Sequence, residues 1–243
     1  MPELPEVETI RRQLTRKIIG KKLNDRKVIN VRRRAKILMI DFSDNSSLVF
    51  HLKLTGQLIF NGKPLPSTRK VFYFKDGSRL VFNDTRKFGR VWLVQDPNEV
   101  LGGLGPEPLS DGFTAQILYD GLQSRHRQLK PLLLDQSFLA GMGNIYTDEA
   151  LHKARLHPLA SSDSVNREQA QALWEAIREV LQEGIRRNGA SIDWVYRGGE
   201  FQNYFRVYDR KDQPCPVCGT AIERLVVGQR GTHVCPNCQR NRS

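Results

Sequence analysis

The sequence predicts an α+β protein of several domains, with an N-terminal helix and an antiparallel β-sandwich followed by helices and a cysteine-bearing hairpin. Three observations predict this class. Apolar residues recur at helical spacing near the N-terminus, short β-branched and aromatic runs fill residues 25–94, and helical periodicity returns after a Gly- and Pro-rich stretch. The chain has 243 residues, which is enough for one large or two small domains with real cores.

The composition narrows the class of partner. The chain carries 38 basic and 26 acidic residues, a net charge of +12, which favours binding to a polyanion. Nucleic acid is the leading candidate and a membrane surface is the alternative. No apolar run approaches the roughly 20 residues that span a bilayer, and the N-terminus lacks the apolar core of a signal peptide. We therefore expect a cytoplasmic protein without membrane association, and a monomer.

The first ten residues, MPELPEVETI, combine a reactive chain end with a helix start. Removal of Met1 would expose Pro2 as a secondary amine, and a free α-amino group has a pKa of about 7.7 to 8.0, so part of it is a neutral nucleophile at physiological pH. Glu3 and Glu6 lie within one helical turn, close enough to transfer protons. In the alternative interpretation, the prolines and glutamates only start a helix and complement its dipole. The helix itself is predicted from the spacing of Val7, Ile10, Leu14 and Ile18, and it ends at Gly20.

Residues 25–94 contain about seven short strand-like runs, separated by turn residues at 43–45, 61–62 and 76–77. This spacing predicts an antiparallel sandwich or a flattened barrel. Basic clusters occur at 32–36 and 86–90, and such clusters are usually solvated strand edges. Phe88, two residues after Arg86, favours instead a wedge beside a cation that could fill the gap left by a flipped base. Leu54, considered alone, is more typical of a core residue.

The second half of the chain is predicted to be helical after a linker. We expect domains at 1–104 and 113–202, a linker at 105–112, and a hairpin domain at 203–243; the clearest helix spans about 165–187. The motif GMGNIYTDEAL predicts two helices joined by a tight turn, where backbone N–H groups and the Asn144 amide suit a phosphate oxygen. Asn144 could equally be the N-cap of the second helix, and both roles are compatible.

All four cysteines lie near the C-terminus in the pattern C-x2-C-x16-C-x2-C. This spacing is typical of a four-cysteine zinc ribbon, and four thiolates leave no open position on the metal. We therefore expect one structural zinc ion per chain, held in a hairpin whose tip includes residues 229–232. The predicted ligands are Cys215, Cys218, Cys235 and Cys238.

Together these segments resemble the formamidopyrimidine-DNA glycosylase and endonuclease VIII family, most closely the formamidopyrimidine-DNA glycosylase branch. The resemblance covers nearly the whole chain in order: PELPEVET, RRRAK, HLKLTGQL, DTRKFG, LAGMGNIYTDEAL, FQNYFRVYDR and the cysteine hairpin. It implies a helix-two-turn-helix domain with a zinc finger. It also implies a bifunctional DNA glycosylase and abasic-site lyase of bacterial base excision repair, which removes 8-oxoguanine, formamidopyrimidines or hydantoins from duplex DNA through a Schiff base and β,δ-elimination.

The resemblance also implies roles for catalytic residues. Pro2 is the amine that attacks C1′, Glu3 handles protons at the deoxyribose with Glu6 in support, and Lys36 approaches the phosphate and the lesion. For DNA binding, Asn144 and Arg230 hold phosphates. The void in the duplex is filled by Leu54, Arg86 and Phe88.

Two departures from the family pattern bear on specificity. The lesion-capping loop at 191–202 is short, and Leu54 replaces a methionine that the family usually carries. The short loop favours, as an alternative, endonuclease VIII-like activity on oxidised pyrimidines and hydantoins. Two further alternatives come from other functional classes: a damaged-DNA-binding protein with little turnover, and a zinc-ribbon protein that binds RNA.

Overall fold

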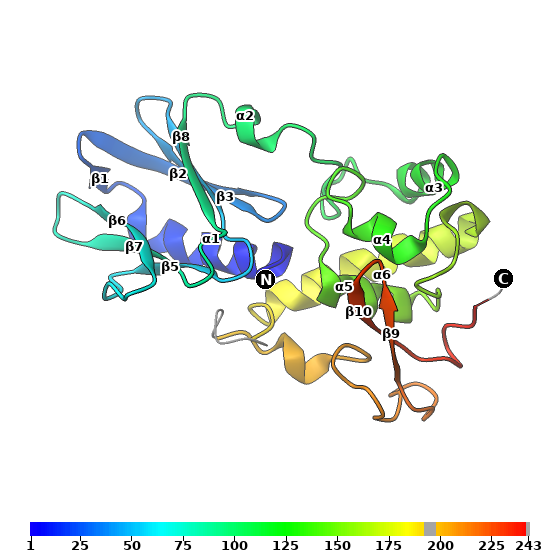
Figure 1. Ribbon diagram of the computed structural model, residues 1–243. Coiled ribbons are helices and arrows are strands. Elements are labelled where there is room, and N and C mark those ends of the chain that lie inside the picture. Colours follow the sequence, from blue (N-terminus) through cyan, green and yellow to red (C-terminus); the bar gives the residue numbers. More distant parts are fainter. Residues whose placement is uncertain (192–197, 242–243) are drawn as a thin grey trace. The chain divides into compact units, whose positions relative to one another are not determined.

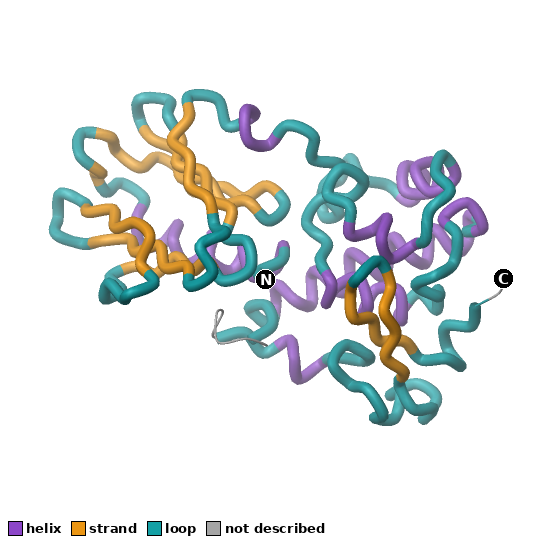
Figure 2. Tube along the Cα trace, in the orientation of Figure 1, coloured by secondary structure: helices purple, strands orange, loops and turns teal. Residues whose placement is uncertain are grey.

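The computed structural model describes residues 1–191 and 198–241. It consists of two compact units, Met1–Gly103 with Arg187–Glu200, and Leu104–Arg186 with Phe201–Ser243. The first unit holds most of the strands and the second most of the helices (Figure 2), so the predicted α+β class is confirmed. The division into four parts stays a prediction. Among the described residues, no helix is long and apolar enough to cross a membrane.

The first unit contains helix α1 (Leu4–Ile18), the one-turn helix α2 (Asn98–Leu101) and two antiparallel sheets (Figure 1). One sheet has the strand order β1-β2-β3-β4-β8 and the other β5-β7-β6. The positive φ angles of Asn45, Asn61 and Gly77 confirm the three predicted turns. The strands are β1 (Lys22–Leu23), β2 (Arg26–Arg34), β3 (Ile37–Phe42), β4 (Ser47–His51), β5 (Gly56–Phe60), β6 (Thr68–Tyr73), β7 (Arg79–Asp84) and β8 (Arg90–Val94).

Helix α1 packs its apolar face into the core of the first unit. This face is the one predicted from the sequence, and it is buried together with inward-facing side chains of both sheets. The helix starts with a capping box, in which the Glu6 carboxylate accepts from the backbone N–H of Glu3 and the Glu3 side chain accepts from that of Glu6. The start of the helix, and with it the position of Pro2, is therefore fixed by hydrogen bonds as well as by packing.

The second unit contains the two predicted helices joined by a turn, α4 (Leu129–Leu134) and α5 (Asn144–Lys153). Helix α4 begins two residues before Pro131, which is tolerated because the N–H groups of a first helical turn have no intrahelical partner. Gly141, in the turn, has a φ of +110°. The remaining elements are α3 (Ala115–Gln123), η1 (Ser162–Ser164), α6 (Arg167–Arg186), η2 (Phe201–Tyr204), β9 (Glu223–Val227) and β10 (Arg230–Val234).

Candidate functional site

The N-terminal residues are buried at the head of α1. Pro2 is buried, and Glu3 and Glu6 are each only 2% exposed. Glu6 has both carboxylate oxygens occupied: Oε2 accepts from the N–H of Glu3 at 2.7 Å and Oε1 from the N–H of Ala190 at 2.8 Å. Glu6 therefore ties the start of the chain to a segment more than 180 residues away.

Gly189 is a part of this arrangement that the sequence did not reveal. Its φ is +82°, and a Cβ atom built on it would lie 2.6 Å from Oε1 of Glu6. Any other residue would be strained by the backbone conformation and would push against the carboxylate. The only sequence signal was a glycine in a polar stretch, which is also typical of an ordinary loop.

Lys36 lies in the turn between β2 and β3 and is 5% exposed. The preceding residue, Ala35, has a φ of +54°, and its carbonyl accepts from Arg33 Nη1 at 3.0 Å. Arg33 in turn donates to Glu8 of α1 at 3.2 Å. The interpretation of residues 32–36 as a solvated edge therefore fails for Lys36, whose turn is connected to α1 through buried charges.

Glu8 is the centre of this connection. Arg11 donates to it at 2.8 and 2.9 Å, and Arg12 donates at 2.8 Å. Burial alone would raise the pKa of Glu8, but the hydrogen bonds from Arg11 and Arg12 and the charges of Arg11 and Arg33 lower the pKa to about 2. Glu8 is thus ionised at neutral pH and holds the Lys36 turn against α1.

Replacing Glu8 with Gln is expected to lower stability at neutral pH by up to about 3 kcal/mol, since each unit of pKa shift corresponds to about 1.4 kcal/mol. A depressed pKa stabilises the fold above the unfolded-state value of about 4.5, and this contribution is lost as the pH falls through about 2. Urea unfolding of wild type and Glu8→Gln should be measured from pH 7 down to pH 2. The free energies of unfolding of the two proteins should converge at the acid end.

As a control, Asp25→Asn removes a carboxylate paired with Lys75 on the exposed surface, where solvent screens the ion pair, so it should change stability and its acid dependence much less than Glu8→Gln does. A Glu8→Gln protein that stays less stable than wild type by the same amount at every pH would contradict the assignment.

The three predicted wedge residues lie on two loops of the first unit that are hydrogen bonded to each other. Leu54 is partly buried in the turn before β5, while Phe88 is 53% exposed in the loop after β7, with the Arg86 guanidinium 5.6 Å from the centre of its ring. Asp84 joins the loops, because it accepts from the hydroxyl of Thr55 and, at 2.6 Å, from the N–H of Gly89. The loop after β7 thus presents a cation beside an exposed ring, and the hydrogen bonds of Asp84 tie this loop to the one that carries Leu54.

Asn144 and Arg230, 86 positions apart in the sequence, are brought together in the second unit. Asn144 is the first residue of α5, and its Nδ2 donates to the carbonyl of Gly231 at 3.0 Å. The alternative that Asn144 is the N-cap is wrong, because Gly143 holds that position and no side-chain cap is formed. Arg230 is exposed and follows a turn in which Gly228 and Gln229 have positive φ. Both side chains are therefore positioned at the tip of the β9–β10 hairpin.

A buried ion pair that the sequence did not predict holds this hairpin. Lys130 of α4 and Asp148 of α5 are each 0% exposed, and their Nζ and Oδ1 atoms are 2.5 Å apart. Lys130 also donates to Thr232 Oγ1 at 2.8 Å and to the Gly231 carbonyl at 3.1 Å. Asp148 Oδ2 accepts from the N–H of His233 at 2.9 Å. The ion pair thus joins both helices to β10 beside Asn144.

Glu149, which follows Asp148 on α5, binds the backbone of another segment. Its carboxylate accepts from the backbone N–H groups of Arg206, Val207 and Tyr208 at 2.8 to 3.1 Å. Burial raises the pKa of Glu149, and these three hydrogen bonds oppose the rise only in part. Asp148 and Glu149, the acidic pair of the motif GNIYTDEAL, therefore bind two separate backbone segments, at His233 and at residues 206–208.

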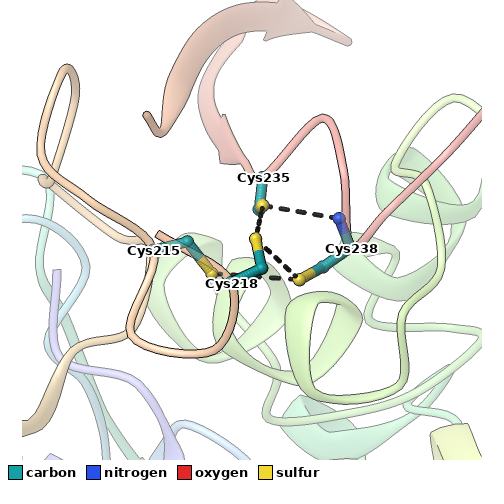
Figure 3. Close-up of side chains that lie close together, drawn as sticks. All are labelled: Cys215, Cys218, Cys235 and Cys238. Carbon is teal, nitrogen blue, oxygen red and sulfur yellow. Dashed lines mark hydrogen bonds between the residues drawn. The ribbon is translucent and has the colours of Figure 1, made fainter. Parts of the chain in front are cut away.

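The four cysteines form a cluster whose Sγ atoms all lie within 4.8 Å of one another (Figure 3). The shortest separations are 3.4 Å for Cys218 to Cys235 and for Cys218 to Cys238, and 3.9 Å for Cys215 to Cys238. Tetrahedral zinc with Zn–S bonds of about 2.3 Å places its sulfurs about 3.8 Å apart, so the geometry fits a zinc ion. The sequence-predicted ligand set is thus brought together completely.

His152 lies next to the cysteine cluster, and no motif in the sequence predicted this position. His152, on α5, has Nε2 3.4 Å from Sγ of Cys215. Burial, and then the charges of Arg206, Arg210 and Arg155, lower the pKa of His152 to about 4. These effects favour the uncharged form of the ring.

Comparison with known proteins gives three family matches along the chain. Residues 19–91 match the formamidopyrimidine-DNA glycosylase N-terminal domain, residues 104–195 match the formamidopyrimidine-DNA glycosylase H2TH domain, and residues 212–241 match the zinc finger found in FPG and IleRS. The formamidopyrimidine-DNA glycosylase of Pelotomaculum thermopropionicum is 40% identical, over 99% of this chain and 99% of its own length.

Solved structures give the same result. The crystal structure of MutM (Fpg) from Thermus thermophilus has a TM-score of 0.92 and 42% identity, with 98% of each chain covered. The complex between Lactococcus lactis Fpg and DNA containing an abasic site has a TM-score of 0.93 and 29% identity, covering 99% of this chain and 100% of that one. The similarity is therefore continuous across both units.

Proposed function

Because the chain belongs to the formamidopyrimidine-DNA glycosylase family, we propose that it is a bifunctional DNA glycosylase and abasic-site lyase that removes oxidised bases from duplex DNA. The observation that carries this proposal is the buried N-terminus, where Pro2 and Glu3 precede α1 and Glu6 fixes them through two backbone hydrogen bonds. The capping box uses a carboxylate at position 3, and its 2% exposure also places a buried acid next to Pro2 in the chain.

In the proposed reaction, the amine of Pro2, freed by removal of Met1, attacks C1′ of the damaged nucleotide. The C1′–N bond to the base breaks and the base leaves with a proton. The C1′–O4′ bond of the sugar ring then opens, O4′ takes a proton, and an iminium forms between Pro2 and C1′. The iminium acidifies the C2′ proton, so β-elimination breaks the bond to the 3′ phosphate and δ-elimination the bond to the 5′ phosphate. Glu3 is the adjacent acid that protonates and deprotonates the sugar.

The remaining predicted residues bind the substrate in this proposal. Lys36 supplies a cation for the phosphate and the lesion. Asn144 and Arg230 hold backbone phosphates, which position the duplex without reading sequence. Leu54, Arg86 and Phe88 fill the space left by the flipped nucleotide, and extrusion costs least at a damaged pair. The net charge of +12 supplies the general attraction to DNA.

Formamidopyrimidines, 8-oxoguanine and hydantoins are the proposed substrates, and complexes of Lactococcus lactis Fpg contain Fapy-dG or abasic-site DNA. The expectation of a short capping loop at 191–202 falls partly on residues 192–197, which lie outside the described residues. Activity on oxidised pyrimidines therefore stays the alternative. The zinc ion is proposed to be structural: its four cysteines hold the base of the hairpin that carries Arg230, and no chemical step involves the metal.

Trapping with borohydride tests the reaction. Incubation of the zinc-loaded protein with abasic duplex DNA and sodium borohydride should give a covalent adduct, which mass spectrometry should locate at an N-terminal Pro2. Pro5→Ala, which changes the first turn of α1 but keeps the terminal amine, should still give the adduct. A folded, zinc-loaded protein that forms no adduct, or forms one only through a lysine, would overturn the mechanism and favour a protein that only binds damaged DNA.

A further inference from the structure

Helix α5 contacts the β9–β10 hairpin and the cysteine cluster through polar side chains at intervals of four residues. Asn144 donates to Gly231, Asp148 accepts from the N–H of His233, and His152 contacts Cys215. Residues four apart lie on the same face of a helix. One face of α5 therefore reaches from the proposed phosphate-binding tip to the zinc ligands.

The contact between His152 and Cys215 is buried. His152 is 2% exposed and Cys215 is 3% exposed, and the N···S distance of 3.4 Å is within the range of a hydrogen bond to sulfur. The other ring nitrogen, Nδ1, has no hydrogen-bond partner among the described residues. The ring borders a cavity of about 280 Å³ whose lining includes Arg155 and Arg206. Cys215 is therefore the polar group that determines how this imidazole is oriented.

The chemistry of the metal then fixes the direction of the hydrogen bond. A cysteine bound to zinc is a thiolate, which can accept a hydrogen bond but cannot donate one. Nε2 is the ring nitrogen that lies 3.4 Å from Cys215 Sγ, so the contact is favourable only when Nε2 carries a proton. Outer-shell hydrogen bonds of this kind orient metal ligands, and their loss typically costs about 10- to 100-fold in metal affinity or activity.

We propose that His152 is a positioning residue of the zinc site, whose Nε2–H donates to the Cys215 thiolate, holds that ligand in place and slows loss of the metal. The same hydrogen bond anchors the C-terminal end of α5 to the cluster, while Asp148 and Asn144 anchor the rest of the helix to β10. This role goes beyond DNA repair chemistry, and its test requires no DNA, so it can fail while the proposed enzyme activity holds.

Zinc release and cobalt spectra provide the first test. With excess chelator, His152→Phe, which keeps a flat ring but lacks the donor, should release zinc about 10-fold faster than wild type. Its cobalt-substituted form should show the sulfur-to-cobalt charge-transfer band at lower energy, because a thiolate without the hydrogen bond holds its electrons less tightly. His152→Gln, which retains an N–H donor, should restore both properties towards wild type. His126→Gln replaces an exposed histidine of the same unit and should change neither.

A measurement on the wild-type protein keeps the proposal testable should the variants misfold. In the ¹⁵N-labelled, zinc-loaded full chain, long-range ¹H–¹⁵N spectra should show a proton on Nε2 of His152. With ¹¹³Cd in place of zinc, that proton should couple to the metal across the hydrogen bond. An Nδ1–H tautomer, or wild-type zinc release and charge-transfer energy in a folded His152→Phe protein, would overturn the proposal.

Discussion

Replacing Lys130 with Met is expected to lower the free energy of unfolding by about 3 to 5 kcal/mol, because it leaves the carboxylate of Asp148 buried without its cation. Both side chains are 0% exposed, and the lysine also donates to Thr232 and Gly231. Methionine has a similar length, so packing changes little while three hydrogen bonds are lost. Urea unfolding of the zinc-loaded protein at pH 7, followed by circular dichroism, would measure the change.

Two further variants distinguish the effect of losing the buried ion pair from the effect of losing any positive charge. Lys153→Met removes an ion pair with Glu179 that is 2.7 Å long but 29% and 58% exposed, and it should cost less than about 1 kcal/mol. Combining Lys130→Met with Asp148→Leu should restore part of the stability, since no buried charge then remains unpaired. If Lys130→Met costs no more than Lys153→Met, the ion pair does not stabilise the hairpin.

The ion pair between Lys130 and Asp148 could not be predicted from the sequence. Spacing rules act within one element or one motif. They predicted α1 from its apolar period, which is confirmed, and they predicted from two C-x2-C pairs the four cysteines that the fold brings together. Lys130 pairs with Asp148 and Thr232, which are 18 and 102 residues away. No local period links them, so a lysine in an apolar helix could not be assigned a partner.

Hydrogen bonds between side chains and distant backbone groups could not be predicted from the sequence either. Glu6 was expected to support catalysis, but the sequence does not show that its partners are Glu3 and Ala190 or that Gly189 must lack a side chain. Asp84, which joins the two wedge loops, likewise has no sequence signal that distinguishes it from other turn residues. These contacts depend on chain reversals whose tertiary positions cannot be derived from composition or propensity.

On the proposed function, replacing Glu3 with Gln is expected to slow base excision by about 10² to 10⁴-fold, the usual contribution of a positioned general acid or base. The fold should be retained, since the amide oxygen can still accept from the N–H of Glu6 in the capping box and the backbone N–H of Glu3 still reaches Glu6. Single-turnover cleavage of a duplex with one formamidopyrimidine, beside thermal unfolding, would measure both effects.

Glu6→Gln is the matched control because it makes the same chemical change one helical turn away. Its amide can accept only one of the two backbone hydrogen bonds that Glu6 receives from Glu3 and Ala190, and its NH₂ group then faces the other N–H. This variant should therefore be less stable and lose activity through displacement of Pro2, whereas Glu3→Gln should lose activity at nearly full stability. A Glu3→Gln protein that excises the base at the wild-type rate would show that this carboxylate transfers no proton in the reaction.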